Sequence, residues 1–297
     1  MNHSKGLKLF FLINPGSGTN KTDWPAEITA YFADSAHTVE LFQLNKDYSL
    51  DKIKEKIGAF SPHRVVAVGG DGTLKLAAEC IRGTTIPLGM LPAGSANGLA
   101  TELGIPPQPA KALEVLVNGR EKKIHATLIN GQLCIHLSDI GLNAYVVKKF
   151  EMQKVRGMWG YVMASLKVLW QNPQMEVEMV IDKKAFKISA AMIVVANATK
   201  YGTGAVINPV GALDDDVFEV VVIKKIAVGK LLKMAFFQAP YDPETVEIFQ
   251  TDALKIRSGK KVYFQIDGEY LGKVKEVKAI LLPEALTLIV PVPEGGK

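Results

Sequence analysis

The segment from Arg64 to Leu74, Arg-Val-Val-Ala-Val-Gly-Gly-Asp-Gly-Thr-Leu, constrains the fold more than any other part of the chain. Its apolar run, Val65 to Val68, predicts a buried parallel strand, and Lys75 to Cys80 continues as a helix. Glycines in the turn between them let the backbone approach a ligand closely, and the amides of the following helix favour negative charge. The segment therefore predicts a phosphate-binding loop. The loop consists of Gly69, Gly70, Asp71, Gly72 and Thr73.

Asp71 is the unusual residue of this loop, because a carboxylate next to a phosphate would repel it. The repulsion disappears if Mg²⁺ lies between them or if the acid takes a proton from an attacking hydroxyl. The structural alternative is a tight turn whose aspartate caps the helix. Both interpretations stay open on this segment alone.

The first hundred residues alternate strand-like and amphipathic patterns, which is typical of a parallel sheet with helical crossovers. The predicted strands are Leu7–Ile13, Thr38–Leu44, Arg64–Val68 and Ile86–Leu91, and the predicted helices are Asp23–Ala33, Leu50–Ala59, Leu74–Arg82 and Ala96–Leu103. Loops that leave the carboxyl ends of parallel strands share one edge of the sheet, where ligands bind. We therefore expect three loops rich in glycine and small polar residues to meet at one nucleotide. Besides Gly69 to Thr73, they contain Asn14, Pro15, Ser17 and Gly18, and Gly94, Ser95 and Asn97.

Gly69-Gly70-Asp71-Gly72-Thr73 resembles the motif shared by diacylglycerol kinases, sphingosine kinases and their bacterial lipid-kinase relatives, and more distantly by NAD kinases and phosphofructokinases. The other two loops also resemble the lipid kinases, whose patterns are Asn-Pro-x-Ser-Gly and Leu-Pro-x-Gly-(Thr/Ser)-x-Asn. The resemblance implies ATP as the bound nucleotide, with Ser95 and Asn97 donating hydrogen bonds to it. A simple helix cap is the alternative for Asn97.

Beyond Arg120 strand patterns dominate, and they predict a second, antiparallel domain. A short helix predicted at Ala110–Asn118 precedes this region. The predicted strands of the second domain are Lys123–Ile129, Gln132–Ile140, Met175–Ile181, Phe186–Ala196, Val217–Lys224, Val246–Ile256, Lys261–Ile266 and Val274–Leu282, with helices near Ala144–Lys154, Met158–Gln171 and Val228–Gln238. The fold class is thus α/β plus all-β. We expect a three-layer parallel-sheet nucleotide-binding domain over residues 1–122, and a β-sandwich lipid-substrate domain over 123–297 whose last residues can pack back on the first.

Three polar segments of the second domain have counterparts in the lipid-kinase pattern. Arg156 lies where a basic segment of the family reaches phosphate, and Asp267 and Glu269 form the family's Asp-Gly-Glu, with Asp267 near the nucleotide and Glu269 as a base or metal-side acid. Adjacent acids repel and call for a cation, so Asp214 and Asp215 are candidate Mg²⁺ ligands. Asp216 stands where the family has glycine. A solvated acidic turn and an ordinary Asp-Gly hairpin are the structural alternatives.

Composition excludes several other classes of protein. Two cysteines cannot build a disulfide framework or a zinc site, and no apolar stretch is long enough to span a membrane, which favours the cytoplasm. The net charge of +5 suits nucleotide phosphates or anionic lipid surfaces, so we expect peripheral membrane contact and no requirement for nucleic acid. A homodimer is left open.

The resemblance implies a lipid kinase that transfers the γ-phosphate of Mg²⁺-ATP to a lipid hydroxyl, with Asp71 or Glu269 as the base. Sphingosine kinases keep an acid where this chain has Tyr145, and many bacterial relatives have aspartate where it has Asn143. A cationic amine without a carboxylate partner is costly to bury, so a neutral diacylglycerol-like lipid is expected, although Asp139 could substitute. The alternatives are an NAD kinase-like enzyme and a nucleotide-binding protein that has lost catalysis.

Overall fold

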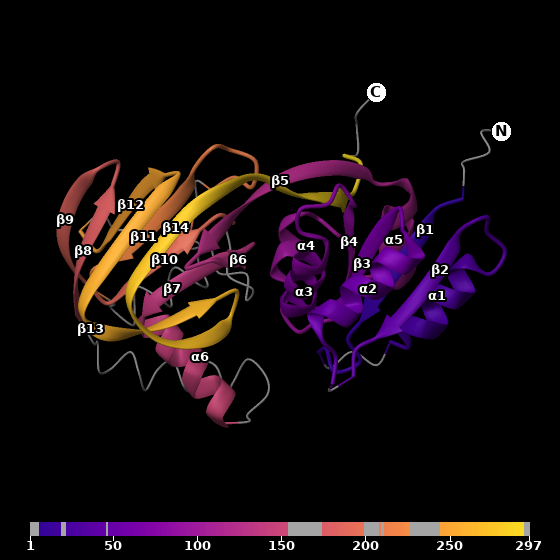
Figure 1. Ribbon diagram of the computed structural model, residues 1–297, viewed down its shortest axis with the longest axis horizontal. Helices are drawn as coiled ribbons and strands as arrows, with labels where there is room; N and C mark the ends of the chain where they lie inside the picture. Colours follow the sequence, from indigo (N-terminus) through magenta and orange to yellow (C-terminus); the bar gives the residue numbers. More distant parts are fainter. Residues whose placement is uncertain are drawn as a thin grey trace. The chain divides into compact units, whose positions relative to one another are not determined.

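A computed structural model describes residues 6–18, 22–45, 47–153, 174–198, 208, 211–225 and 244–293 of the chain (Figure 1). The chain forms two compact units. The first contains the residues up to Ile124 together with those from Glu284 onward, and the second runs from His125 to Pro283. In the described residues, no helix is long and apolar enough to cross a membrane.

The first unit is built on a parallel sheet whose strands are β1 (Lys8–Ile13), β2 (Thr38–Gln43), β3 (Arg64–Gly69) and β4 (Leu88–Pro92), in the order β2-β1-β3-β4. The chain moves from β1 to β2 on one side and then back past β1 to β3. Because such crossovers are right-handed, this reversal puts the first two helices on opposite faces of the sheet. The loops after β1 and β3 therefore lie at the point where the strand order reverses, which is where open α/β sheets bind ligands.

The helices of this unit are α1 (Trp24–Phe32), α2 (Leu50–Phe60), α3 (Asp71–Ile81), α4 (Gly98–Glu102) and α5 (Pro109–Asn118). α1 packs beside α5, and α2 packs beside α3. Local sequence explains the starts of the first two helices, since the side chains of Asp23 and Ser49 accept the amides of Ala26 and Lys52. The third helix begins at Asp71, three residues before the predicted Leu74, because Gly70 is its N-cap. The other boundaries of the strands and helices predicted before Arg120 agree to within two residues. The strands predicted at Lys123–Ile129 and Val274–Leu282 are longer in the structure, where they span Arg120–Ile129 and Glu269–Val290.

The second unit is the predicted antiparallel β-sandwich, which α6 (Leu142–Gln153) accompanies. Its strands are β5 (Arg120–Ile129), which begins in the first unit, β6 (Gln132–Cys134), β7 (Leu137–Gly141), β8 (Met175–Ile181), β9 (Lys184–Ala190), β10 (Met192–Ala196), β11 (Phe218–Ile223), β12 (Val246–Thr251), β13 (Ala253–Ile266) and β14 (Glu269–Val290), which ends in the first unit beside β4. Hairpin turns at Asn130-Gly131 and Asp182-Lys183 join β5 to β6 and β8 to β9, with positive φ at all four residues.

Three strands predicted as continuous are each divided in the structure. Phe186–Ala196 is divided near Ala191, because β9 pairs with β8 whereas β10 pairs with β7 and β11. Val246–Ile256 is divided at Asp252, because β12, before this residue, pairs with β11, whereas β13, after it, pairs with β8. Gln132–Ile140 is divided at Ile135 and His136, because their backbone amides donate to the carboxylate of Asp267 and not to a neighbouring strand. Conversely, the predicted Lys261–Ile266 is the end of the long strand β13.

Two of the predicted helices, Met158–Gln171 and Val228–Gln238, lie outside the described residues. The same holds for Arg156, the residue predicted to contact phosphate. The helix predicted at Ala144–Lys154 is α6, which begins two residues earlier.

Candidate active site

The three predicted loops of the first unit meet at the carboxyl edge of its sheet. The amide of Asn14 donates to the carbonyl of Val68 at 3.0 Å, and its Nδ2 donates to Oγ1 of Thr73 at 3.2 Å, which joins the first loop to the second. The amide of Ala93 donates to the carbonyl of Gly69 at 2.9 Å, which joins the second loop to the third. The convergence expected from the order of strands is therefore present.

Two glycines allow the loops to approach each other this closely. A Cβ atom on Gly94 would lie 2.5 Å from Cα of Gly70, and one on Gly18, whose φ is +65°, would lie 2.5 Å from the carbonyl oxygen of Ala93. By contrast, a Cβ on Gly72, in the first turn of α3, would meet no atom within 4 Å. The glycines thus pack the loops together while leaving space at the amino end of α3. There the amide of Thr73 donates to the carbonyl of Gly70 at 3.0 Å, and the earlier amides of the helix have no acceptor in a preceding turn.

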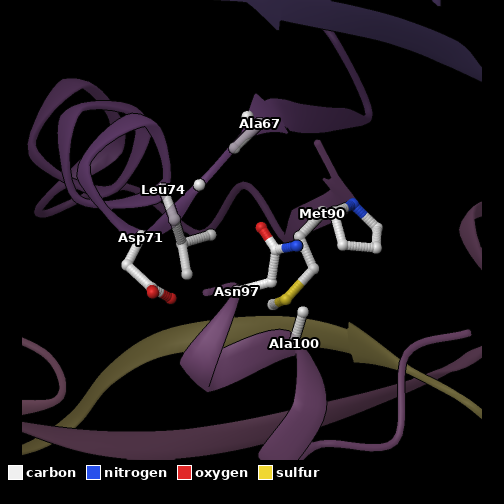
Figure 2. Close-up of a pocket in the computed structure, with 9 residues that line it drawn as sticks. Ala67, Asp71, Leu74, Met90, Asn97 and Ala100 are labelled. Atoms are coloured by element: carbon white, nitrogen blue, oxygen red, sulfur yellow. The ribbon is translucent and has the colours of Figure 1, made fainter. Parts of the chain in front are cut away.

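A small pocket lies among these loops (Figure 2). Figure 2 shows Asp71 and Leu74 of α3 on one side of it and Met90, Asn97 and Ala100 on the other. The pocket is lined by Ala67, Gly69, Gly70, Asp71, Leu74, Met90, Pro92, Asn97 and Ala100.

Asp71 binds backbone amides at the start of α4. Its Oδ2 accepts the amide of Gly98 at 2.9 Å and its Oδ1 accepts the amide of Leu99 at 3.2 Å. The acid therefore caps a helix, as the structural alternative proposed, but it caps α4 and not the helix to which it belongs. This contact ties the second loop to the third, and a role for Asp71 in proton or metal chemistry stays a prediction.

Asn97 closes the third loop. It has a left-handed backbone with φ of +51°, its Oδ1 accepts the amide of Gly94 at 2.8 Å, and its Nδ2 donates to the carbonyl of Gly94 at 2.9 Å. The Asn97 amide thus shapes the loop, while Ser95, between the two residues, is exposed. In the first loop, Pro15 is exposed and Ser17 is half-buried, and contact of any of these residues with a nucleotide stays a prediction.

In the second unit, Asp267 is the acid that divides the strand predicted at Gln132–Ile140. It lies in the turn between β13 and β14 with φ of +49°, and the next residue, Gly268, has φ of +83°. Its carboxylate accepts the amides of Ile135, His136 and Leu137 at 3.2, 2.9 and 3.2 Å. Asp267 therefore does occupy an Asp-Gly hairpin turn, and its carboxylate holds the link between β6 and β7 in place.

A buried polar network that the motifs do not reveal supports this turn. Gln265 is fully buried, its Oε1 accepts the amide of Gly268 at 2.7 Å, and its Nε2 donates to Oδ2 of Asp139. Nδ2 of Asn143 donates to the same oxygen at 2.6 Å. The one sequence signal is a glutamine between Phe264 and Ile266 in an apolar strand. Glu269, the first residue of β14, is exposed beside this network.

The acidic segment before β11 contains one carboxylate oxygen suited to a cation. Oδ1 of Asp215 is buried and has no hydrogen-bond partner among the residues that the structure describes. Burial, followed by the charge of Asp214, raises the pKa of Asp215, while His125 opposes the shift. Asp216 is 99 % exposed, with its Oδ1 4.0 Å from Nε2 of His125. Over the described ranges, no three His, Cys, Asp or Glu residues are grouped so that they could hold a metal ion. Mg²⁺ binding by Asp214 and Asp215 stays a prediction.

Two family models together match most of the chain. The diacylglycerol kinase catalytic domain matches residues 8–129, and the YegS C-terminal NAD kinase beta sandwich-like domain matches residues 138–290.

Individual proteins match over similar lengths. The diacylglycerol kinase of Bacillus subtilis is 26% identical over 70% of this chain and 71% of that protein. An uncharacterized protein of Synechocystis is 29% identical over 77% of this chain, which spans 55%, about half, of that relative's length. The crystal structure of a diacylglycerol kinase from Bacillus anthracis covers 97% of this chain and 98% of its own, with a TM-score of 0.73 and 16% identity, and so shows the same fold. The chain belongs to the family of diacylglycerol kinase-like lipid kinases.

Proposed function

We propose that this protein transfers the γ-phosphate of ATP to the hydroxyl of a neutral, diacylglycerol-like lipid. The convergence of three glycine-containing loops at the switch point of the parallel sheet is the observation that carries the proposal, because it offers backbone amides to a polyphosphate. Phosphoryl transfer depends mainly on positioning and on stabilisation of charge, and a cradle of amides supplies both.

The nucleotide-binding residues of this proposal are those of the three loops. The open space next to Gly72 and the first amides of α3 suit phosphate oxygens. We assign Mg²⁺ to the acidic segment before β11, because Oδ1 of Asp215, which has no hydrogen-bond partner among the described residues, is a hard ligand of the kind that Mg²⁺ prefers. When bound, the ion would supply positive charge to neutralise neighbouring anions.

Glu269 is the better candidate for the base that takes the proton of the acceptor hydroxyl. Both oxygens of Asp71 already accept amides of α4, and the oxygens of Asp267 accept amides of the β6–β7 link. Within the described residues, the exposed carboxylate of Glu269 has no hydrogen-bond or ion-pair partner. A carboxylate that is not committed to the fold can accept a proton without breaking it.

The burial and the hydrogen bonds of Asp139 favour a neutral acceptor over sphingosine. This acid is the remaining carboxylate that could pair with a sphingoid ammonium, but it is buried and accepts hydrogen bonds from Gln265 and Asn143. An ammonium placed near Tyr145 and Asn143 would lose water without gaining a carboxylate. A diacylglycerol hydroxyl carries no such cost.

Radiolabelled ATP and mixed micelles that contain either diacylglycerol or sphingosine test the proposal. We expect label in the organic phase with diacylglycerol, and slower labelling of sphingosine at equal surface concentration. Faster labelling of sphingosine would contradict the acceptor assignment. A third reaction offers NAD as the acceptor, and label that appears only in NAD would favour the NAD kinase-like alternative. Absence of ADP release with every acceptor would favour a nucleotide-binding protein without catalysis.

A further inference from the structure

Helix α6 and the β13–β14 hairpin bring three tyrosines and two lysines together in the second unit. The ring centroids of Tyr145 and Tyr263 are 4.6 Å apart, and those of Tyr263 and Tyr270 are 6.1 Å apart. Figure 1 shows α6 near β13 of the sandwich, which it contacts. We call Tyr145, Lys148, Tyr263, Tyr270 and Lys273 the lysine–tyrosine patch.

The two lysines of the patch share one aromatic ring. Nζ of Lys148 lies 5.2 Å from the centroid of Tyr263 and 5.7 Å from that of Tyr270, while Nζ of Lys273 lies 4.3 Å from the centroid of Tyr263. Cation–π contacts attract each ammonium to the ring but neutralise neither charge. In the described part of the chain, neither lysine forms an ion pair with an acid. Two positive charges held at one ring favour an anion beside them.

The surrounding hairpin adds positive charge that acids do not balance. Lys260, Lys261 and Lys275 are exposed on the same two strands. The nearby acid Glu276 is already paired with three cations, of which Arg257 is at 2.9 Å, Lys278 at 3.2 Å and Lys255 at 3.6 Å. Of the other acids of the hairpin, Asp267 accepts backbone amides and Glu284 pairs with Lys123, while Glu269 is exposed. The exposed lysines of the hairpin therefore outnumber its uncommitted acids.

This combination of residues matches the surface of a membrane better than a soluble anion. Tyrosines have an apolar ring and a polar tip, and they gather at the boundary between lipid and water. Lysines beside them can keep their ammonium groups among lipid phosphates while their stems cover apolar surface. Each lysine near an anionic leaflet contributes roughly 1 kcal/mol of attraction.

We propose that the lysine–tyrosine patch docks this protein on a bilayer that contains anionic phospholipid. The proposal rests on the proposed function in one respect, since a lipid kinase must meet its acceptor at such a surface. The two lysines of the patch are not among the residues assigned to ATP binding or to proton transfer. The partner is the anionic leaflet and not one particular lipid.

Co-sedimentation of the full chain with vesicles tests the proposal. We expect binding to phosphatidylcholine vesicles that contain phosphatidylglycerol, weak binding to phosphatidylcholine alone, and loss of binding as salt rises. The double variant Lys148→Ala, Lys273→Ala should partition roughly 30-fold more weakly. The matched control is Lys184→Ala, Lys187→Ala, which removes two exposed lysines of β9 and should bind as the parent protein does. Lys148→Arg, Lys273→Arg should retain binding.

The docking proposal is wrong if the double variant binds vesicles as well as the parent protein does, or if both alanine pairs lose vesicle binding equally. It is also wrong if inorganic phosphate displaces the bound protein at unchanged ionic strength, because that result would indicate a site for a free anion. Melting temperatures of all variants identify any loss of vesicle binding that comes from unfolding.

Transfer of phosphate to diacylglycerol in neutral detergent micelles separates the docking proposal from the proposed function. A double variant that keeps this activity but loses vesicle binding supports both, whereas vesicle binding by a parent protein without transfer refutes the proposed function alone.

Discussion

The Asp71→Asn substitution separates a structural acid from a catalytic one. The carboxylate accepts the amides of Gly98 and Leu99 with its two oxygens. Asparagine keeps one acceptor and turns an NH₂ group toward the other amide, so one charge-assisted hydrogen bond is lost and the other is weakened. Hydrogen bonds to charged groups contribute about 1.5 to 3 kcal/mol each. We expect the first unit to lose about 2 kcal/mol of unfolding free energy and its melting midpoint to fall by roughly 5 to 10 °C.

The kinetic consequence follows from where the two amides lie. They begin α4, directly after the loop closed by Asn97, so Asp71→Asn should loosen the third loop and raise the KM for ATP more than it lowers kcat. Glu269→Gln is the matched comparison, because this exposed side chain forms no hydrogen bond or ion pair among the described residues. Loss of a general base there should lower kcat about 10² to 10⁴-fold without changing the melting temperature.

Calorimetry and steady-state kinetics with both variants decide between these roles. All rates are measured well below the melting midpoint of the less stable variant, so that unfolding does not contribute. If Asp71→Asn melts like the parent protein but loses the larger share of kcat, our reasoning is wrong and Asp71 is the base. If Glu269→Gln turns over normally, Glu269 has no part in proton transfer.

Three further predictions concern other acids, a thiol and the buried network. Mg²⁺ should raise the melting temperature of the parent protein but not of Asp214→Ala or Asp215→Ala, and an equal response in all three would make the acidic segment a solvated turn. Burial raises the pKa of Cys80 to about 11, so at pH 8 only about 0.1% is thiolate, and modification by a thiol reagent should follow unfolding and not a fast second-order reaction. Gln265→Leu should destabilise the second unit by about 3 kcal/mol in denaturant titrations, because it removes a donor from buried Asp139, and a change below 1 kcal/mol would contradict this.

The fold could be predicted because its signals are local. Apolar runs such as Val65 to Val68 are too short for helices, the following segments have helical spacing, and glycine turns separate the two. Parallel strands then bring the ends of consecutive loops to one edge whatever the exact side-chain contacts are. For the same reason the convergence of the three loops followed from strand order alone.

The strand breaks could not be predicted because their causes are distant in sequence. Nothing near Ile135 and His136 marks an interruption, since the carboxylate that binds their amides belongs to Asp267. Likewise Ala191 and Asp252 separate strands that pair with different neighbours, and pairing is a property of the assembled sandwich. Local patterns indicate that a segment can form a strand, but they do not indicate which neighbouring strand it will pair with.

The acids of this chain show the same limit in its functional site. Asp71, Asp139 and Asp267 each stand where a motif or a family position suggests chemistry, yet each accepts hydrogen bonds that hold a helix start, a glutamine or a strand link. A motif identifies the acid but not the donors that surround it, and those donors decide whether a carboxylate can exchange a proton or a ligand without loosening the fold. By this criterion we assign the proposed base to the exposed Glu269, and the proposed metal ligand to Asp215, whose Oδ1 has no hydrogen-bond partner among the described residues.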